Sequence, residues 1–166
     1  FHGLEDVAMM CSRFIIYLFH CPIEHPTDNR RRAELPFFIA HLLHRLNLAT
    51  SVAMAALILL CRLKEEYPNV RGSSGHRLFL AALMLADKFL NDESYENEDW
   101  VTAARGYYPL WEIHQMEREM CRFLTWDLRV DGEMLRAFEN SLRAGFSEDR
   151  AQYAPIPYAM VCNRSR

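Results

Sequence analysis

Few residues in this 166-residue chain are spaced as the groups of a catalytic or metal site would be. The sequence contains no glycine-rich phosphate loop, no Gly-x-Ser-x-Gly, no His-Glu-x-x-His and no calcium-binding loop. His41 and His44 could ligate one metal ion from a helix, but no third ligand follows at a suitable spacing. We therefore predict packed or solvated histidines, no metal, no cofactor and no enzymatic activity.

Two clusters of charge have both a functional and a structural interpretation. Five acidic residues between positions 92 and 99 could supply a pair of catalytic carboxylates, or could mark the start of a helix, where the helix dipole favours negative charge. Arg30, Arg31 and Arg32 could bind phosphate or direct the chain to the nucleus, or could be solvated linker residues. We favour the structural interpretation for both clusters.

The choice of cation singles out one residue. Of the 19 lysines and arginines, only Lys64 and Lys88 are lysine. In such a chain a plain surface cation at position 88 would be expected to be arginine. Lysine instead offers a compact head with three donors on a flexible stem, which suits point contacts with carbonyl oxygens. Lys88 is therefore a candidate binding residue.

The elements that must position these residues are all predicted helices. Apolar residues recur at helical spacing over 5–19, 35–46, 51–67, 74–90, 95–105, 110–124 and 131–143. Thr50 or Ser51 and Ser73 or Ser74 can cap two of these helices, and Gly145 is a natural stop for the last. Residues 78–86 include no polar side chain, so their helix should be central. The chain is predicted to be all-α, with a proline-containing linker at 21–34 and an irregular tail after Gly145.

Composition limits the partners that can be expected. With 51% hydrophobic and 25% charged residues the chain is typical of a globular domain. A net charge of −3 leaves no surplus of positive charge for phosphates, so we expect no nucleic acid. The longest uncharged apolar run, 51–61, is shorter than the roughly 20 residues that span a bilayer, so we expect no membrane association. Five scattered cysteines favour reduced thiols in the nucleus, the cytoplasm or both.

Two segments together resemble a known family. Residues 81–90 read AALMLADKFL, and residues 116–128 read MEREMCRFLTWDL. They resemble the cyclin box, whose third helix ends in Ala-x-Lys-Phe/Tyr and whose fifth helix carries Met-Glu ahead of Leu-x-Phe/Trp-x-Leu. Residues 76–77, 88–92 and 126–130 are similar to the fungal PCL-type cyclins, the relatives of the phosphate-pathway cyclin. The stretch after Val130, which is too short for a second five-helix repeat, is also similar to that group.

The resemblance implies a fold and a partner. The fold would be a cyclin box over 35–130, a five-helix bundle around a central third helix. An N-terminal helix and linker (1–34) and a C-terminal helix and tail (131–166) would be added to it. The chain would be the activating subunit of a cyclin-dependent kinase, bound one-to-one to the kinase helix αC, and would help to select that kinase's protein substrates.

The resemblance also assigns a binding site. In the cyclin fold the ends of the third and fifth helices are neighbours, so Lys88 and Glu117 would lie close together. The apolar residues expected around them are Leu85, Phe89, Cys121, Trp126 and Leu128. We predict that all seven bind the kinase, as does Asp92, which could contact an arginine of the activation loop.

The residues of the predicted site and the chain itself could also have other roles. Lys88 and Glu117 could form an internal salt bridge that ties two helices, and Asp92 could favour the start of the next helix. The chain could also be a cyclin-box scaffold or adaptor in transcription that binds a peptide. Residues 35–42 read LPFFIAHL and lack the Met-Arg-Ala-Ile-Leu motif with which mitotic cyclins dock Arg-x-Leu substrates, so that docking mode is not expected.

Overall fold

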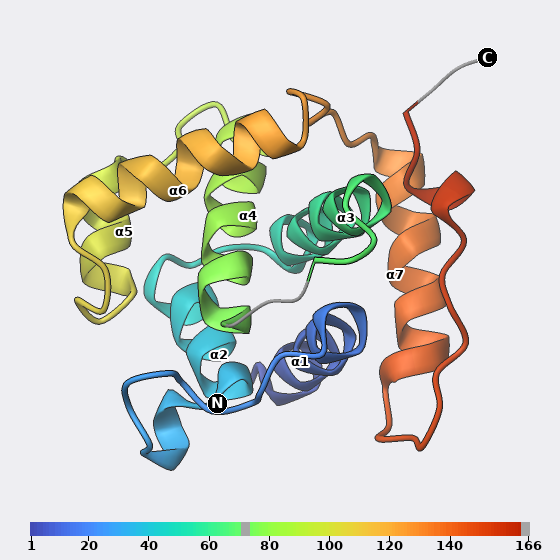
Figure 1. The fold of residues 1–166 in the computed structure, drawn as a ribbon, viewed down its shortest axis with the longest axis horizontal. Helices are drawn as coiled ribbons and strands as arrows, with labels where there is room; N and C mark the ends of the chain where they lie inside the picture. The colour runs from blue at the N-terminus through green and yellow to red at the C-terminus, as the bar shows by residue number, and fades with distance from the viewer. Residues whose placement is uncertain (71–73, 164–166) are drawn as a thin grey trace.

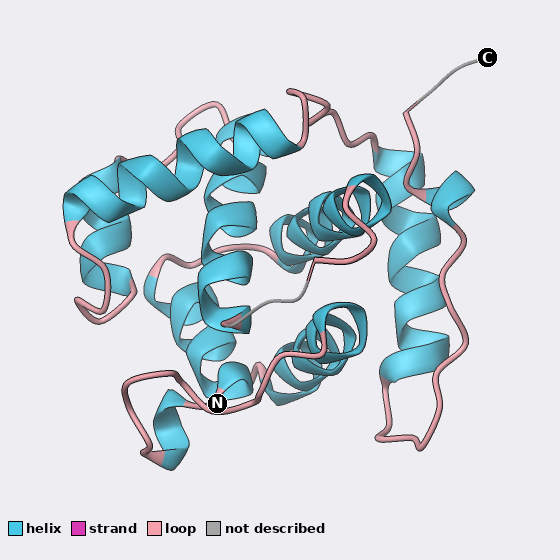
Figure 2. Cartoon of the chain, in the orientation of Figure 1, coloured by secondary structure: helices cyan, strands magenta, loops and turns pink. Residues whose placement is uncertain are grey.

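The computed structural model describes residues 1–70 and 74–163, and within these ranges every regular element is helical (Figures 1 and 2). The all-α prediction is confirmed. Two 3-10 turns, η1 (Arg31–Ala33) and η2 (Tyr158–Met160), accompany the α-helices. The helices are α1 (Glu5–Phe19), α2 (Leu35–Arg45), α3 (Thr50–Glu66), α4 (Gly75–Leu90), α5 (Asn97–Ala103), α6 (Leu110–Phe123) and α7 (Gly132–Phe146).

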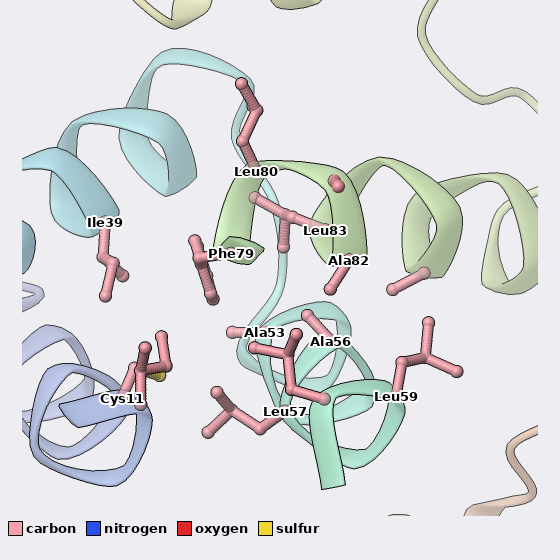
Figure 3. Packing of buried hydrophobic residues seen from close by; sticks show 14 of the residues in the cluster. Cys11, Ile39, Ala53, Ala56, Leu57, Leu59, Phe79, Leu80, Ala82 and Leu83 are labelled. Atoms are coloured by element: carbon pink, nitrogen blue, oxygen red, sulfur yellow. The ribbon is translucent and has the colours of Figure 1, made fainter. Parts of the chain in front are cut away.

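Helix α4 lies at the centre of the bundle, as its apolar segment predicted. It packs against α1, α2, α3 and α6, and its residues 79–87 are all buried. Figure 3 shows Phe79 and Ala82 of α4 directed toward α3, where Ala53 and Ala56 leave room for them. Small residues let two helix backbones approach closely, which favours tight packing of α4 on α3.

Helices α1 and α7 share this core. Phe14 of α1 makes edge-to-face contacts with Phe138 and Phe146 of α7, with ring centroids 5.6 and 5.0 Å apart. Such aromatic pairs stabilise the fold by about 0.5–1.5 kcal/mol beyond the contribution of the surface that they bury.

The predicted division of the chain at residues 34 and 130 stays a prediction, and apolar contacts cross both boundaries.

Several helix ends differ from prediction. The N-cap of α3 is Ala49, and neither Thr50 nor Ser51 caps it. The hydroxyl of Ser74 caps α4 by accepting the Arg77 N–H at 3.2 Å, whereas Ser73 lies outside the described residues. Gly145 does not stop α7, because the helix continues to the fully buried Phe146, whose packing outweighs the roughly 1 kcal/mol that a helical glycine costs.

Helix α5 is shorter than predicted but begins at the predicted cluster of carboxylates. Asp99 accepts a hydrogen bond from the Glu96 N–H at 3.0 Å, which confirms that this end of the cluster marks a helix start. Tyr95, predicted to be helical, instead donates its hydroxyl to the Leu46 carbonyl at 2.7 Å. This bond ties the segment between α4 and α5 to the end of α2.

The segment after α7 is irregular apart from one 3-10 turn, as predicted, but it packs against the helices. It forms η2, which contacts α3 and α7, and its Val161 is 1% exposed. Figure 1 shows this segment running back beside α7. Over the part of the chain that the structure describes, no helix combines the length and the apolar character needed to cross a bilayer.

Candidate functional site

The end of α4 and the middle of α6 meet at an ion pair. Lys88, in the last turn of α4, is paired with Glu117 of α6, which confirms that the two residues lie close together. The Lys88 ammonium also donates a hydrogen bond of 2.9 Å to Oδ1 of Asn97, at the start of α5. Three helices therefore converge on one lysine.

Asn97 connects both charges of this pair. Its amide nitrogen donates to Oε1 of Glu117 at 3.0 Å and to Nδ1 of His114 at 2.8 Å. The residue is 7% exposed, so both amide hydrogens and the oxygen are used in a nearly dry environment. We call Lys88, Asn97, His114 and Glu117 the Lys88 network. Sequence reasoning missed Asn97 and His114, because no spacing links them to Lys88 until α5 folds back onto α6.

The Lys88 network links α4, α5 and α6, and it also has surface that a partner can contact. The side chains of Lys88 and Glu117 keep 30% and 19% of their surface exposed. An ammonium has three donors, and residues that the structure describes accept two of those on Lys88. One donor therefore remains for an oxygen outside the chain. The predicted internal salt bridge exists, and its geometry leaves binding capacity for a partner.

An apolar pocket of about 330 Å³ lies beside this network. It is formed between α3, the end of α4 and the segment that follows α6. Its lining residues are Ala55, Leu59, Ala86, Phe89, Leu90, Leu128, Arg129 and Val130. Phe89 is 57% exposed at its rim, whereas Leu128 is buried. A polar pair next to an apolar pocket suits a helix that inserts an apolar side chain and brings polar backbone groups to the pair.

The other apolar residues of the predicted site divide into two groups. Leu85 and Cys121 are buried, so they support the surface from below. Burial raises the pKa of the Cys121 thiol, Glu117 raises it further, and Lys88 opposes them. Cys121 is thus a protonated thiol packed behind the ion pair. Trp126 and Phe89 are exposed, so the outward apolar surface comes from these two aromatic residues.

Trp126 occupies an unfavourable position in two respects. The large apolar residue Trp126 is 70% exposed. Its φ of +61° lies in the left-handed region, as does the φ of +50° of the preceding Thr125. The turn is held by hydrogen bonds of 3.0 Å from the Trp126 N–H to the Cys121 carbonyl and from the Asp127 N–H to the Leu124 carbonyl. A strained, exposed aromatic residue that is held in place this way is typical of a binding surface.

Asp92 lies on an ordered loop. The buried carboxylate of Asp87 accepts hydrogen bonds from the Asn91 side chain at 2.7 Å and from the Tyr95 N–H at 3.1 Å. Asp92 itself is exposed and makes no hydrogen bond to any described residue. The helix dipole acts on charges within the first turn of α5, and Asp92 lies outside that turn. The carboxylate is therefore available at the edge of the surface.

The other candidate groups contribute to the fold or remain at the surface. His44 stacks on His2 with ring centroids 3.9 Å apart, and no three histidine, cysteine or acidic side chains within 1–70 and 74–163 are grouped to hold a metal ion. Arg30 is paired with Asp28 at 2.6 Å. Arg31 lies over a phenylalanine ring.

A comparison with protein families matches the cyclin N-terminal domain to residues 15–129. The chain belongs to this family. The resemblance seen in residues 81–90 and 116–128 is thereby confirmed, and with it the cyclin fold. The match includes all eight predicted site residues of this cyclin domain, and it begins within α1.

Three of the curated proteins that this cyclin domain resembles come from Saccharomyces cerevisiae. It is 37% identical to PHO85 cyclin-9 over 109 residues, which cover 64% of this chain and 36% of the relative. It is 38% identical to PHO85 cyclin-1 over 110 residues (63% and 39%) and 36% identical to PHO85 cyclin-2 over 101 residues (59% and 33%). The cyclin domain thus matches less than two fifths of each relative's length. The comparison with solved structures finds no match.

Proposed function

We propose that this cyclin domain is the activating subunit of a cyclin-dependent kinase and forms a one-to-one complex with it. The observation that carries the proposal is the Lys88 network beside an apolar pocket. The name that the relatives share, PHO85 cyclin, supports a partner of the PHO85 type. We call the proposed contact area the kinase-binding surface. It consists of Lys88, Phe89, Asp92, Glu117, Trp126 and Leu128, with Leu85 and Cys121 beneath them.

Activation follows from a difference in affinity. In protein kinases, phosphoryl transfer needs an ion pair between a lysine of strand β3 and a glutamate of helix αC, and the position of αC decides whether that pair forms. A rigid surface that binds αC better in its inward position shifts the population toward the active kinase. A shift from 1:99 to 99:1 requires about 10⁴-fold tighter binding of the active form. The cyclin domain itself would do no chemistry.

The kinase-binding surface offers αC two kinds of contact. The apolar pocket receives one of its apolar side chains between Phe89 and Leu128. The free donor of Lys88 reaches a backbone carbonyl, and Glu117 accepts from a backbone N–H. Because Asn97 already fixes both charged side chains, little side-chain entropy is lost when they bind.

The remaining proposals concern context. We propose that the complex acts in the nucleus, the cytoplasm or both, on the basis of the five scattered cysteines. The net charge of −3 supports a protein partner over nucleic acid. The cyclin domain would also contribute to the choice of the kinase's protein substrates.

The test combines binding with activation. We expect the purified chain to bind a PHO85-type kinase one-to-one in calorimetry and to raise its activity toward a peptide substrate. Lys88→Ala should weaken binding by about 2 kcal/mol, because a partner carbonyl loses its donor. The matched control is Lys64→Ala, since the Lys64 ammonium donates to the Val70 carbonyl within the chain.

Three outcomes would contradict the proposal or part of it. A chain that binds no cyclin-dependent kinase is not the regulatory subunit of one. A chain that binds the kinase without raising its activity would favour the alternative of a scaffold or adaptor. Equal losses of affinity in Lys88→Ala and Lys64→Ala would remove Lys88 from the surface.

A further inference from the structure

Arg62, near the C-terminal end of α3, is 4% exposed and directs its guanidinium at main-chain oxygens. Nε donates to the Val161 carbonyl at 2.7 Å. Nη1 donates to the backbone carbonyl of Asp127 at 3.1 Å, and Nη2 donates to that of Arg129 at 2.8 Å. No carboxylate within the described ranges forms a salt bridge with it. A buried cation without an ion pair needs its N–H groups hydrogen-bonded, so the three carbonyls must be held toward it.

These carbonyls come from two segments that are distant in sequence. One segment follows α6 and carries Trp126 and Leu128, and the other is the tail that follows η2. Two further hydrogen bonds join the segments directly: the Asn163 amide donates to Oδ1 of Asp127 at 2.9 Å and to the Arg129 carbonyl at 2.6 Å. The Arg129 oxygen thus accepts from both Arg62 and Asn163.

Beyond the hydrogen-bonded turn at 124–127, the segment between α6 and α7 has little backbone support. Among the residues that the structure describes, no backbone N–H of residues 128–130 donates to a backbone oxygen. The burial of Leu128 and the hydrogen bonds that the carbonyls of Asp127 and Arg129 accept therefore hold this segment. Those bonds come from α3 and from the tail.

We infer that Arg62 and Asn163 are positioning residues of the kinase-binding surface, through which the tail 158–163 fixes the segment that carries Trp126 and Leu128. This inference rests on the proposed function, because it takes that segment as part of the surface. Neither residue touches the kinase. Each holds the inner side of the segment, so that Trp126 is presented to the partner and Leu128 closes the apolar pocket.

Asn163 is the better position for testing the inference, since it is partly exposed. Arg62 is buried, so changing it would also destabilise the fold. Asn163→Asp keeps the size of the side chain but removes both donors, and it places a carboxylate against the Asp127 carboxylate and the Arg129 carbonyl. The matched control is Asn140→Asp, at an exposed position of α7 where the asparagine makes no hydrogen bond to described residues.

Two readouts separate positioning from folding. The indole N–H signals of the three tryptophans are followed by NMR in the full chain, with the signal of Trp126 assigned through Trp126→Phe. The dissociation constant for a PHO85-type kinase is then measured by calorimetry. In Asn163→Asp we expect the Trp126 signal to shift and broaden while that of the buried Trp100 stays unchanged, and the dissociation constant to rise about tenfold. Asn140→Asp should change neither.

The outcomes distinguish this inference from the proposed function. If Asn163→Asp leaves both the Trp126 signal and the dissociation constant as in the parent, the tail does not position the surface, even though the parent's binding upholds the proposed function. If the parent binds no kinase, the proposed function fails. The Trp126 signal then still decides whether the tail positions the segment, because that readout needs no partner.

Discussion

The carbonyl oxygen of Ala33 accepts a hydrogen bond of 2.6 Å from Nε2 of His76. Because a carbonyl can only accept, this ring nitrogen carries the proton. The other ring nitrogen, Nδ1, has no hydrogen-bond partner among the described residues, and the residue is fully buried. The bond ties the turn before α2 to the start of α4. Burial lowers the pKa of His76 to about 4, although the Ala33 carbonyl opposes the shift.

This relationship predicts that acid destabilises the fold. Since the folded pKa lies below the usual 6.5, the unfolded chain binds the proton more readily. The contribution of His76 is therefore complete above about pH 6.5 and is lost as the pH falls toward about 4, by about 1.4 kcal/mol per pH unit. Urea unfolding at pH 7 and pH 5 measures this loss.

His76→Gln tests the source of the pH dependence. Glutamine keeps a donor for the Ala33 carbonyl but does not titrate, so the difference in stability between pH 7 and pH 5 should shrink. His20→Asn, at the exposed end of α1, serves as the control and should keep the parent's difference. An unchanged difference in His76→Gln would show that other groups cause the acid sensitivity.

Asn97 is expected to be essential to the Lys88 network. Asn97→Ala should lower the free energy of unfolding by about 1–3 kcal/mol, because it removes the buried amide that bonds Lys88, Glu117 and His114. Asn97→Asp should lower it further, since its carboxylate would face Glu117. Urea unfolding measures both effects, and Asn140→Asp is the control for the added charge. Stability equal to the parent in Asn97→Asp would contradict the role of Asn97.

Trp126 should matter for binding more than for folding. Trp126→Ala should weaken kinase binding by about 2–4 kcal/mol while leaving the melting temperature nearly unchanged, because the residue is largely exposed. Trp111→Ala is the matched control, since Trp111 is 64% exposed but outside the kinase-binding surface. A large fall in melting temperature would show that Trp126 acts in packing, and equal losses of binding in the two variants would contradict its place in the surface.

Asp92 is predicted to support activation after binding. Its exposed carboxylate could contact an arginine of the activation loop, a charge-assisted hydrogen bond worth about 1.5–3 kcal/mol. With a kinase whose activation loop cannot be phosphorylated, and at saturating cyclin domain, Asp92→Asn should therefore lower activity while binding is retained. Glu93→Gln, at the adjacent exposed carboxylate, is the control. Equal activity in the parent and Asp92→Asn complexes would remove Asp92 from the mechanism.

Helix periodicity and two short segments predicted much of this molecule. The apolar run at 78–86 indicated the central helix because a helix that is apolar on all sides must be surrounded by others. Residues 81–90 and 116–128 indicated the family, and the resemblance to that family implied that Lys88 lies beside Glu117. These features are local in sequence, so they can be read without knowing how the helices pack.

Features that depend on distant contacts were not predictable in this way. Gly145 is an ordinary helix stop by local rules, but the burial of Phe146 against α1 extends α7 past it. Asn97 has no sequence signal that relates it to Lys88, since α5 must first fold back onto α6. The tail is irregular outside η2, as predicted, but nothing in its sequence shows that Arg62 will donate a buried hydrogen bond to its Val161 carbonyl.

The sequence by itself determined which segments are helical and which family the chain belongs to, because both can be inferred from residue types and spacing within single segments. Only the tertiary structure decided which side chains face outward at the kinase-binding surface. Trp126 is exposed and Leu128 is buried although they are two residues apart, because the left-handed turn at 125–126 and the bonds from Arg62 orient that segment. Such orientation depends on groups far away in the chain, and they meet only when the bundle has formed.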